Sequence, residues 1–302
     1  MKLVCVGQSA YDITYMIHEP LIENQKYRIQ EKMECIGAPA TNAASLCARW
    51  GLDTTLISRI GSDTYGKLIQ EVLNQDGVHT EYMLVQQGNT SISMIITHIE
   101  TGSRTIFNCP MTKSEQAFTF PQQCDVILMD GHELEASLQL LKCFPNAISI
   151  LDAGTAREDV VALASHCHHL VCSQDFARQY TGIEINREDE TSVIQTFEKL
   201  KNLCPHQIVV TLGESGLLYE QNQKIHHMKA RQVQAIDTTG AGDIFHGAYA
   251  YGISKGWKLE KCLDIATRAS GLSVTKVGGN CAIPTLQEIA FQIEMDQELQ
   301  RK

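Results

Sequence analysis

The residues with the clearest chemical potential form the run Asp237-Thr238-Thr239-Gly240-Ala241-Gly242-Asp243, in which two carboxylates bracket a turn of small residues. Small residues let the backbone approach a ligand closely, and the first amides of a helix have no acceptor within that helix. The turn before the helix-like run from Ile244 therefore has the features of a phosphate site. Asp243, at the expected helix start, could accept a proton from a group reacting above the turn. The residue types alone also fit an ordinary helix cap.

Further polar and small residues lie where strands are expected to end. Asp12 follows the buried strand Leu3-Val4-Cys5-Val6, and ligands of open α/β sheets bind beyond the carboxyl ends of strands. Asn42 lies near the start of a helix that Gly37-Ala38-Pro39 opens, and substrate binding and capping fit it equally well. The turn Thr211-Leu212-Gly213-Glu214-Ser215-Gly216 could let a nucleotide lie against the backbone.

Length and composition indicate a globular protein. The 302 residues are enough for one large α/β domain or two smaller ones. The net charge of −10 argues against a general nucleic-acid surface or an anionic-membrane surface, because both reward clustered Lys and Arg. The first apolar run is too short for a signal peptide, and no stretch approaches ~18 consecutive apolar residues. These features predict a soluble cytoplasmic protein.

The cysteines do not suggest a disulfide framework. Eleven is an odd number in a long chain without a secretory signal, so reduced and mostly buried thiols are expected. The nearest approach to a metal cluster is His166-Cys167-His168-His169 with Cys172, whose crowding suits a loop or strand edge better than tetrahedral zinc.

Strand-like and helix-like stretches alternate along most of the chain, which predicts an α/β fold with a mainly parallel sheet and helices on both faces. Thr54 to Ile60 is expected to form one buried strand. Asp130, Asp152 and Thr211 are expected at the carboxyl ends of strands.

Two segments show the alternation of exposed strands instead. They lie at about 13–35, including Lys26 to Glu31, and at about 91–108, around the turn Thr101-Gly102-Ser103. We expect them to form a flap over a site, within a single domain of residues 1–302.

Taken together, these residues resemble the ribokinase-like (PfkB) family of sugar kinases over most of the chain. The most specific element is the signature D-x-x-G-A-G-D at Asp237 to Asp243, supported by Gly37-Ala38 with Asn42, by Asp12 and by the Thr211 to Gly216 turn. The resemblance implies a three-layer α/β/α sandwich with a mainly parallel central sheet. The flap would be a small β-strand lid, and the protein would dimerise through it.

The activity that the resemblance implies is ATP-dependent phosphoryl transfer to a hydroxymethyl group of a sugar. Asp243 would be the catalytic base, and the amides of Gly240, Ala241 and Gly242 would form an anion hole. Mg²⁺ would bridge the phosphates, and a monovalent cation, commonly K⁺, would lie beside the turn. The remaining implied roles are sugar binding by Asp12, Gly37 and Asn42, nucleotide binding by Thr211, Gly213, Gly216 and Gly279, and cation binding by Asp237 and Thr239.

The sequence departs from the family pattern at two places. Gly37-Ala38 replaces a frequent Gly-Gly, which could crowd the sugar. Ser173-Gln174-Asp175-Phe176 stands where many members carry Asn-x-x-Glu, which organises magnesium and phosphate. A Ser-x-Asp arrangement and the Gly102 to Ile106 strand look like ketohexokinase-like members, which favours a free ketose or ribose-like sugar.

Other functions stay open at this point. A nucleoside kinase on the same fold would differ in its acceptor alone. A non-catalytic sugar or nucleotide sensor would explain the missing Asn-x-x-Glu, although a sensor has no use for the base Asp243. A nicotinamide dehydrogenase is disfavoured because no G-x-G-x-x-G follows the first strand.

Overall fold

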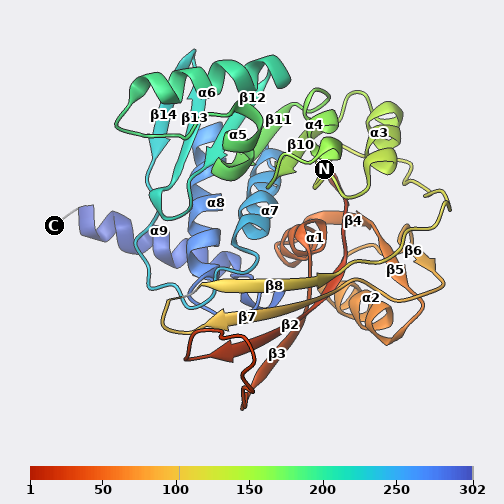
Figure 1. The fold of residues 1–302 in the computed structure, drawn as a ribbon. Helices are drawn as coiled ribbons and strands as arrows, with labels where there is room; N and C mark the ends of the chain where they lie inside the picture. The colour runs from red at the N-terminus through yellow and green to blue at the C-terminus, as the bar shows by residue number, and fades with distance from the viewer. Residues whose placement is uncertain (102, 301–302) are drawn as a thin grey trace.

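An eight-stranded sheet runs through the centre of the molecule in a computed structural model that describes residues 1–101 and 103–300 (Figure 1). Its strands are β1 (Lys2–Val6), β4 (Asp53–Ile57), β9 (Val126–Met129), β10 (Ile148–Ala153), β11 (His169–Ser173), β12 (Gln207–Thr211), β13 (Leu217–Gln221) and β14 (Lys224–Met228). They lie in the order β14-β13-β12-β11-β10-β9-β1-β4. The strands from β12 to β4 are parallel, and β13 and β14 join one edge by antiparallel pairing.

Helices cover both faces of this sheet. Side chains alternate along each strand, so in β1 Leu3 and Cys5 join one apolar core while Val4 and Val6 join the other. The first core is completed by α1 (Pro39–Arg49), α2 (Thr64–Asp76), α7 (Ala241–Ser254), α8 (Leu259–Ser273) and α9 (Leu286–Gln300). The second is completed by α3 (Leu134–Cys143), α4 (Glu158–Ala164), α5 (Gln174–Thr181) and α6 (Glu190–Leu203). The predicted three-layer α/β/α sandwich is confirmed.

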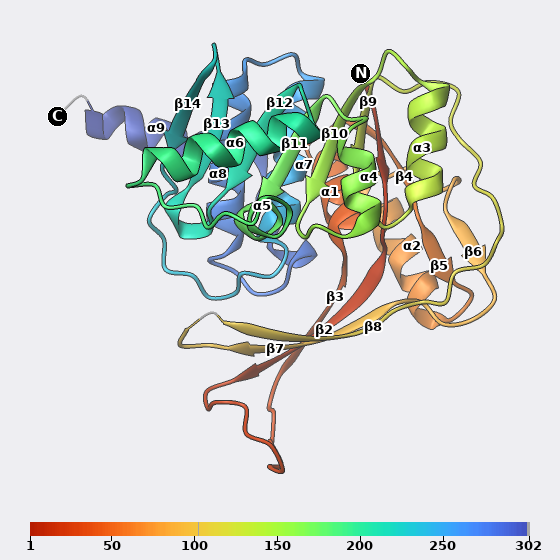
Figure 2. The same cartoon turned by 45° about the horizontal axis from the view of Figure 1, so that its top comes forward.

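A second sheet projects from one side of the sandwich (Figure 2). It contains β2 (Ala10–Ile17), β3 (Lys32–Gly37), β7 (Ile92–His98) and β8 (Arg104–Cys109), in the order β3-β2-β7-β8. We call these four strands the lid sheet. The strand prediction was wrong for Lys26 to Glu31, which lies in the long β2–β3 loop and pairs with no strand among the residues that the structure describes. Of the predicted turn, Gly102 lies outside the described residues.

The predicted strand from Thr54 to Ile60 is two strands. The chain leaves the central sheet after β4, and β5 (Arg59–Gly61) pairs instead with β6 (Leu84–Gln86) in a separate two-stranded sheet. Apolar composition could not reveal this change of sheet, because both strands are almost entirely buried.

Other expectations about the chain are confirmed. Asp130 directly follows β9, Asp152 is the penultimate residue of β10, and Thr211 ends β12. All eleven cysteines are free thiols, and seven of them are buried. Within the described parts of the chain, no helix is long and apolar enough to cross a membrane.

Candidate active site

The turn before α7 has the geometry of an anion cradle. Gly240 has a φ of +73°, a left-handed conformation that favours glycine, and it is the residue from which α7 starts. The first amides of α7 therefore lie at a helix N-terminus, where an anion is favoured, and the N–H group of Ala241 lies 3.4 Å from the Thr238 carbonyl oxygen. Asp243 is in the first turn of the helix and is not its cap. The alternative of an ordinary Asp cap is thus wrong for this residue.

Asp237 fixes the shape of this turn. It is 1% exposed, and its two carboxylate oxygens accept hydrogen bonds from the backbone N–H groups of Thr239 and Gly278, both at 2.9 Å. The hydroxyl of Thr239 is buried and has no hydrogen-bond partner among the residues that the structure describes. The loop thus holds a buried oxygen that could still coordinate a ligand.

Asp243 contacts a residue from the other half of the chain. The Nδ2 atom of Asn42, on α1, donates a hydrogen bond of 2.7 Å to Asp243 Oδ2. Burial raises the pKa of Asp243, whereas the hydrogen bond from Asn42 and the charge of His246 act in the opposite direction. The amide oxygen Oδ1 of Asn42 is buried and has no partner in the described part of the chain. Asn42 is therefore neither a cap nor solvent-facing.

Gly279 completes this group. A Cβ atom added to Gly279 would lie 3.3 Å from Asn42 Nδ2 and 3.5 Å from the Cα atom of Gly240. It immediately precedes the short 3₁₀ helix η2 (Asn280–Ala282). Four of the predicted site residues, from three segments far apart in sequence, thus meet at one point.

The predicted sugar residues Asp12 and Gly37 are also neighbours, on β2 and β3. Any side chain at Gly37 would collide with the Asp12 carboxylate, which is 6% exposed. Burial is the main cause that raises the pKa of Asp12 to about 6. A hydrogen bond with the Ser93 hydroxyl lowers this pKa, and the negative charges of Asp243 and Asp237 raise it further. The lid sheet therefore brings a carboxylate into the electrostatic range of the predicted base.

The predicted nucleotide turn lies at the carboxyl end of β12. Thr211 ends that strand, and Gly213 opens the 3₁₀ helix η1 (Gly213–Ser215) in a left-handed conformation, with open space where a side chain would be. A side chain at Gly216 would collide with the backbone carbonyl of Met228, so Gly216 serves the packing of the turn. The backbone at Gly213 is the accessible part.

The sequence analysis assigned no role to three polar residues of the site, which are Arg104, His246 and Asp152. Arg104, on β8, donates a hydrogen bond from Nη1 to the Thr238 hydroxyl and so connects the lid sheet to the anion turn. The Nδ1 atom of His246 lies 3.1 Å from the carboxylate atom Oδ2 of Asp152. The available signals were weak: Asp152 at a strand end, and a histidine in an otherwise apolar stretch three residues after Asp243.

Asp130 has a different task beside them. Its Oδ2 accepts hydrogen bonds from the backbone N–H groups of Gln8 at 2.9 Å and Ala40 at 3.1 Å. Asp130 therefore connects the chain after β1 to the first turn of α1. Burial would raise the pKa of Asp130, but His132 and the backbone amides outweigh it and lower the pKa. This aspartate therefore supports the site as an anion.

The residues at the position of the missing Asn-x-x-Glu motif, Ser173 to Phe176, have structural roles. The Ser173 hydroxyl accepts a hydrogen bond from the Phe176 N–H as the N-cap of α5, and it donates to the Gly154 carbonyl at 2.7 Å. Phe176 is buried in the core. The Asp175 side chain is 61% exposed and pairs with Arg178. These residues do not reproduce a motif that organises metal and phosphate.

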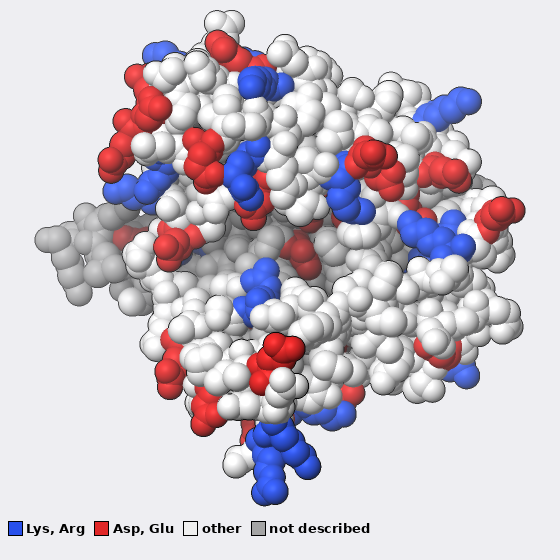
Figure 3. All heavy atoms as spheres, in the orientation of Figure 1, with Lys and Arg blue, Asp and Glu red and all other residues white. Residues whose placement is uncertain are grey.

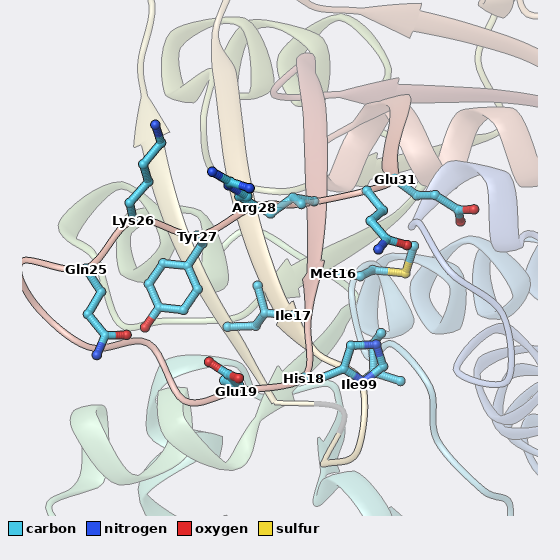
Figure 4. Close-up of a pocket in the computed structure, with 12 residues that line it drawn as sticks. Met16, Ile17, His18, Glu19, Gln25, Lys26, Tyr27, Arg28, Glu31 and Ile99 are labelled. Carbon is cyan, nitrogen blue, oxygen red and sulfur yellow. The ribbon is translucent and has the colours of Figure 1, made fainter.

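A hollow lies on one face of the molecule. Figure 3 shows this hollow crossing the face between the lid strands and the helices above them, with acidic side chains in its floor and a basic side chain on its lower rim. A different pocket, of about 550 Å³, lies in the β2–β3 loop and is lined by Ile17, Tyr27, Arg28 and Ile99 among others (Figure 4). None of the predicted site residues lines it, so it is not the candidate active site.

The histidine and cysteine cluster near β11 is engaged in other contacts. His168 contacts Ser149 at 2.8 Å, His169 contacts the Tyr249 hydroxyl at 2.8 Å, and the sulfur atoms of Cys167 and Cys204 lie 3.8 Å apart. No group of three or more His, Cys, Asp or Glu residues in the described chain could hold a metal ion.

The chain is similar to known proteins over most of its length. The model of the pfkB family carbohydrate kinases matches residues 1–286. The ribokinase of Bacillus subtilis is 26% identical over 267 residues, which cover 84% of this chain and 86% of that protein. A solved structure from Agrobacterium tumefaciens, proposed to be a ribokinase, is 27% identical with a TM-score of 0.89, covering 100% of this chain and 99% of that one. The ribokinase of Arabidopsis thaliana, solved with ribose and ATP, has a TM-score of 0.76 at 22% identity, over 95% and 97% of the two chains.

Proposed function

This chain belongs to the pfkB family of carbohydrate kinases and is an ATP-dependent sugar kinase, and we propose that its acceptor is the hydroxymethyl group of a free ketose or ribose-like sugar. The observation that carries the proposal is the 2.7 Å contact of Asn42 with Asp243 beside the Gly240 turn. A sugar-binding amide, a carboxylate base and an anion cradle are then adjacent.

In the proposed reaction, Asp243 accepts the proton of the attacking hydroxyl. The amides of Gly240, Ala241 and Gly242 stabilise the negative charge on the phosphoryl group during transfer. The sugar is held by Asp12, Gly37 and Asn42. The unpartnered Oδ1 of Asn42 supports this role, because a buried acceptor gains stability from a hydroxyl donor.

We propose that the nucleotide lies along Thr211, Gly213, Gly216 and Gly279. ATP use implies a divalent metal, which we propose is Mg²⁺, and the metal would neutralise charge on the phosphate oxygens. Mg²⁺ is usually bound through one or two carboxylates together with substrate phosphates. Because Ser173, Asp175 and Phe176 do not fit the family's metal-organising motif, we assign no residue of this chain to the metal.

We further propose a monovalent cation, K⁺, beside the turn, with Asp237 and Thr239 among its ligands. The buried and unpartnered hydroxyl of Thr239 supports this site. Bound there, the cation would add positive charge next to the anion cradle.

The lid sheet supports a further proposal about assembly. Ile13, Met94 and Phe107 are paired across three neighbouring strands, so they share the outer face of the lid sheet, and Met94 and Phe107 are 44% and 54% exposed. We propose that segments 13–35 and 91–108 act as the lid of one kinase domain spanning 1–302. A second copy would cover their outer face, and the enzyme would work in the cytoplasm, where ATP is available.

The two alternative functions are not favoured. The family match and the ribokinase relatives support a sugar acceptor over a nucleoside, and the contact between Asn42 and the base Asp243 supports turnover over sensing. The deciding experiment incubates the purified protein with ATP, Mg²⁺ and K⁺ and compares ribose, fructose and adenosine as acceptors. Phosphorylated sugar is the expected product. Product from adenosine alone would identify a nucleoside kinase, and ligand-induced thermal stabilisation without product would identify a sensor.

A further inference from the structure

His246 lies in a pocket of acceptor oxygens, three residues after Asp243 on α7. It is 5% exposed. Its Nδ1 atom lies 2.6 Å from the Gly242 carbonyl oxygen and 3.1 Å from Asp152 Oδ2, and its Nε2 atom lies 3.0 Å from the Val171 carbonyl oxygen. Each ring nitrogen therefore faces a backbone carbonyl oxygen, which can only accept a hydrogen bond.

A neutral imidazole does not satisfy this pocket. It carries one N–H donor and one lone pair, so one nitrogen would turn its lone pair toward a carbonyl oxygen. A doubly protonated ring donates from both nitrogens. A buried charge of this kind needs an opposite charge, which the carboxylate of Asp152 supplies from the end of β10 when it is ionised. Burial raises the pKa of Asp152 to about 7, and His246 acts to lower it.

The surroundings explain the use of a cation here. The carboxylates of Asp12, Asp130 and Asp152 interact electrostatically with one another or with Asp243, and the basic side chains that act to lower these pKa values are His132, Arg104 and His246. Partial burial and like charges disfavour the ionised form of Asp243, yet a general base must be ionised to accept a proton. The direct hydrogen bond to Asp243 comes from the neutral amide of Asn42.

We propose that His246 is a positioning residue for phosphoryl transfer, whose doubly protonated ring, anchored by Asp152, is the fixed positive charge that keeps Asp243 ionised. Residues three apart on a helix have Cβ atoms about 5–6 Å from each other, which is within range for this effect. The inference rests on the proposed role of Asp243 as the base. It adds a residue that never touches the substrate.

The kinetic test is the pH profile of kcat in a His246→Asn variant. Removing the cation should move the acid limb of the profile upward by about one pH unit, with kcat on the alkaline plateau and KM for the sugar nearly unchanged. The control is Tyr249→Phe, one turn further along α7, which removes the hydrogen bond to His169 and should lower stability without moving the acid limb. A folded His246→Asn variant with an unmoved acid limb would overturn the proposal.

The second measurement needs no activity, and its deciding part uses the wild-type protein alone. In wild-type protein labelled with ¹⁵N-histidine, both ring nitrogens of His246 should carry protons at pH 7.5, and an Asp152→Asn variant should lose one of them. A ring with a single N–H at pH 7.5 in the wild type would also overturn the proposal. If no sugar were phosphorylated, the proposed function would fail in the activity assay, while the NMR spectrum would still decide the charge on His246.

Discussion

The side chain of Asn42 on α1 donates a 2.7 Å hydrogen bond to the carboxylate of Asp243 on α7, although 201 residues separate them. The two helices can approach because Gly247 of α7 lies against Ala43 of α1, where a Cβ atom on Gly247 would be 2.9 Å from the Ala43 Cα atom. A residue proposed to hold the acceptor thus also orients the proposed base. In the proposed mechanism, acceptor binding and proton transfer therefore depend on the same contact.

The first prediction concerns the base itself. Asp243→Asn should lower kcat by on the order of 10²–10⁴-fold, because general-base catalysis is lost while the anion cradle remains. Nucleotide binding, measured by calorimetry, should be nearly unchanged. Asp175→Asn serves as the control, since Asp175 is exposed outside the proposed site, and it should keep full activity. Near-normal turnover in Asp243→Asn would refute the assignment of the base.

The two glycines of the turn should respond differently to alanine. A Cβ atom at Gly240 would lie 2.8 Å from the Gly279 Cα atom in a left-handed conformation, so Gly240→Ala should lower both the melting temperature and kcat. A Cβ atom at Gly242 would meet nothing within 4 Å. The Gly242→Ala variant should therefore have the melting temperature of the wild type but a lower kcat, because the methyl group would occupy the space in which the phosphoryl group is proposed to bind. Full activity in Gly242→Ala would argue against an anion cradle there.

Asp12 should make stability depend on pH. Burial raises its pKa from 3.8 to about 6, so between these values the folded chain keeps a proton that the unfolded chain releases. The resulting stabilisation is present below about pH 4 and is lost as the pH rises through about 6. Asp12→Asn should therefore unfold with a free energy higher than the wild type by on the order of 1–3 kcal/mol at pH 8, and with little difference at pH 4. Urea unfolding at both pH values measures this, and a destabilised variant at pH 8 would contradict it.

The same Asp12→Asn variant should bind sugar more weakly, with a raised KM. A carboxylate accepts hydrogen bonds from sugar hydroxyls through both oxygens, whereas an amide has only one acceptor oxygen. Gain of stability with loss of affinity in one variant would distinguish a binding residue from a packing residue.

If K⁺ binds at the proposed site, activation of the enzyme by K⁺ should depend on Thr239. The wild type should be more active with K⁺ than with an equal concentration of tetramethylammonium, and Thr239→Val should reduce that difference by removing one oxygen ligand. Thr267→Val is a matched control, because this half-buried hydroxyl lies on α8, outside the proposed site. Equal activation by K⁺ in the wild type and Thr239→Val would remove Thr239 from the site.

The lid contact of Arg104 gives the last prediction. Arg104→Met should lower kcat/KM by about tenfold or more, because a charge-assisted contact of the guanidinium with Thr238 beside the anion turn is lost. Lys32→Met is the control, since Lys32 also lies on the lid sheet but pairs with Glu34 at 2.9 Å. Equal effects of the two substitutions would indicate a general effect of charge on the lid.

Local patterns were sufficient for much of the fold. Continuous apolar runs such as Leu3 to Val6 indicated buried parallel strands, and the small residues before Asp243 indicated a helix start there, although α7 begins two residues earlier, at Ala241. They failed where pairing was decided elsewhere. Lys26 to Glu31 alternates like a strand but has no partner, and the stretch from Thr54 to Ile60 changes sheet at Ser58.

The sequence by itself determined the kind of chemistry, because the signature from Asp237 to Asp243 encodes an exposed helix start and a carboxylate within a few residues of each other. Only the tertiary structure decided which groups act on that carboxylate. Asn42 and Arg104 contact the signature from other elements, and Asp152 contacts His246, which follows the signature on α7. Backbone conformation depends on neighbours in sequence, whereas charge, burial and hydrogen bonding at a site depend on packing between distant segments.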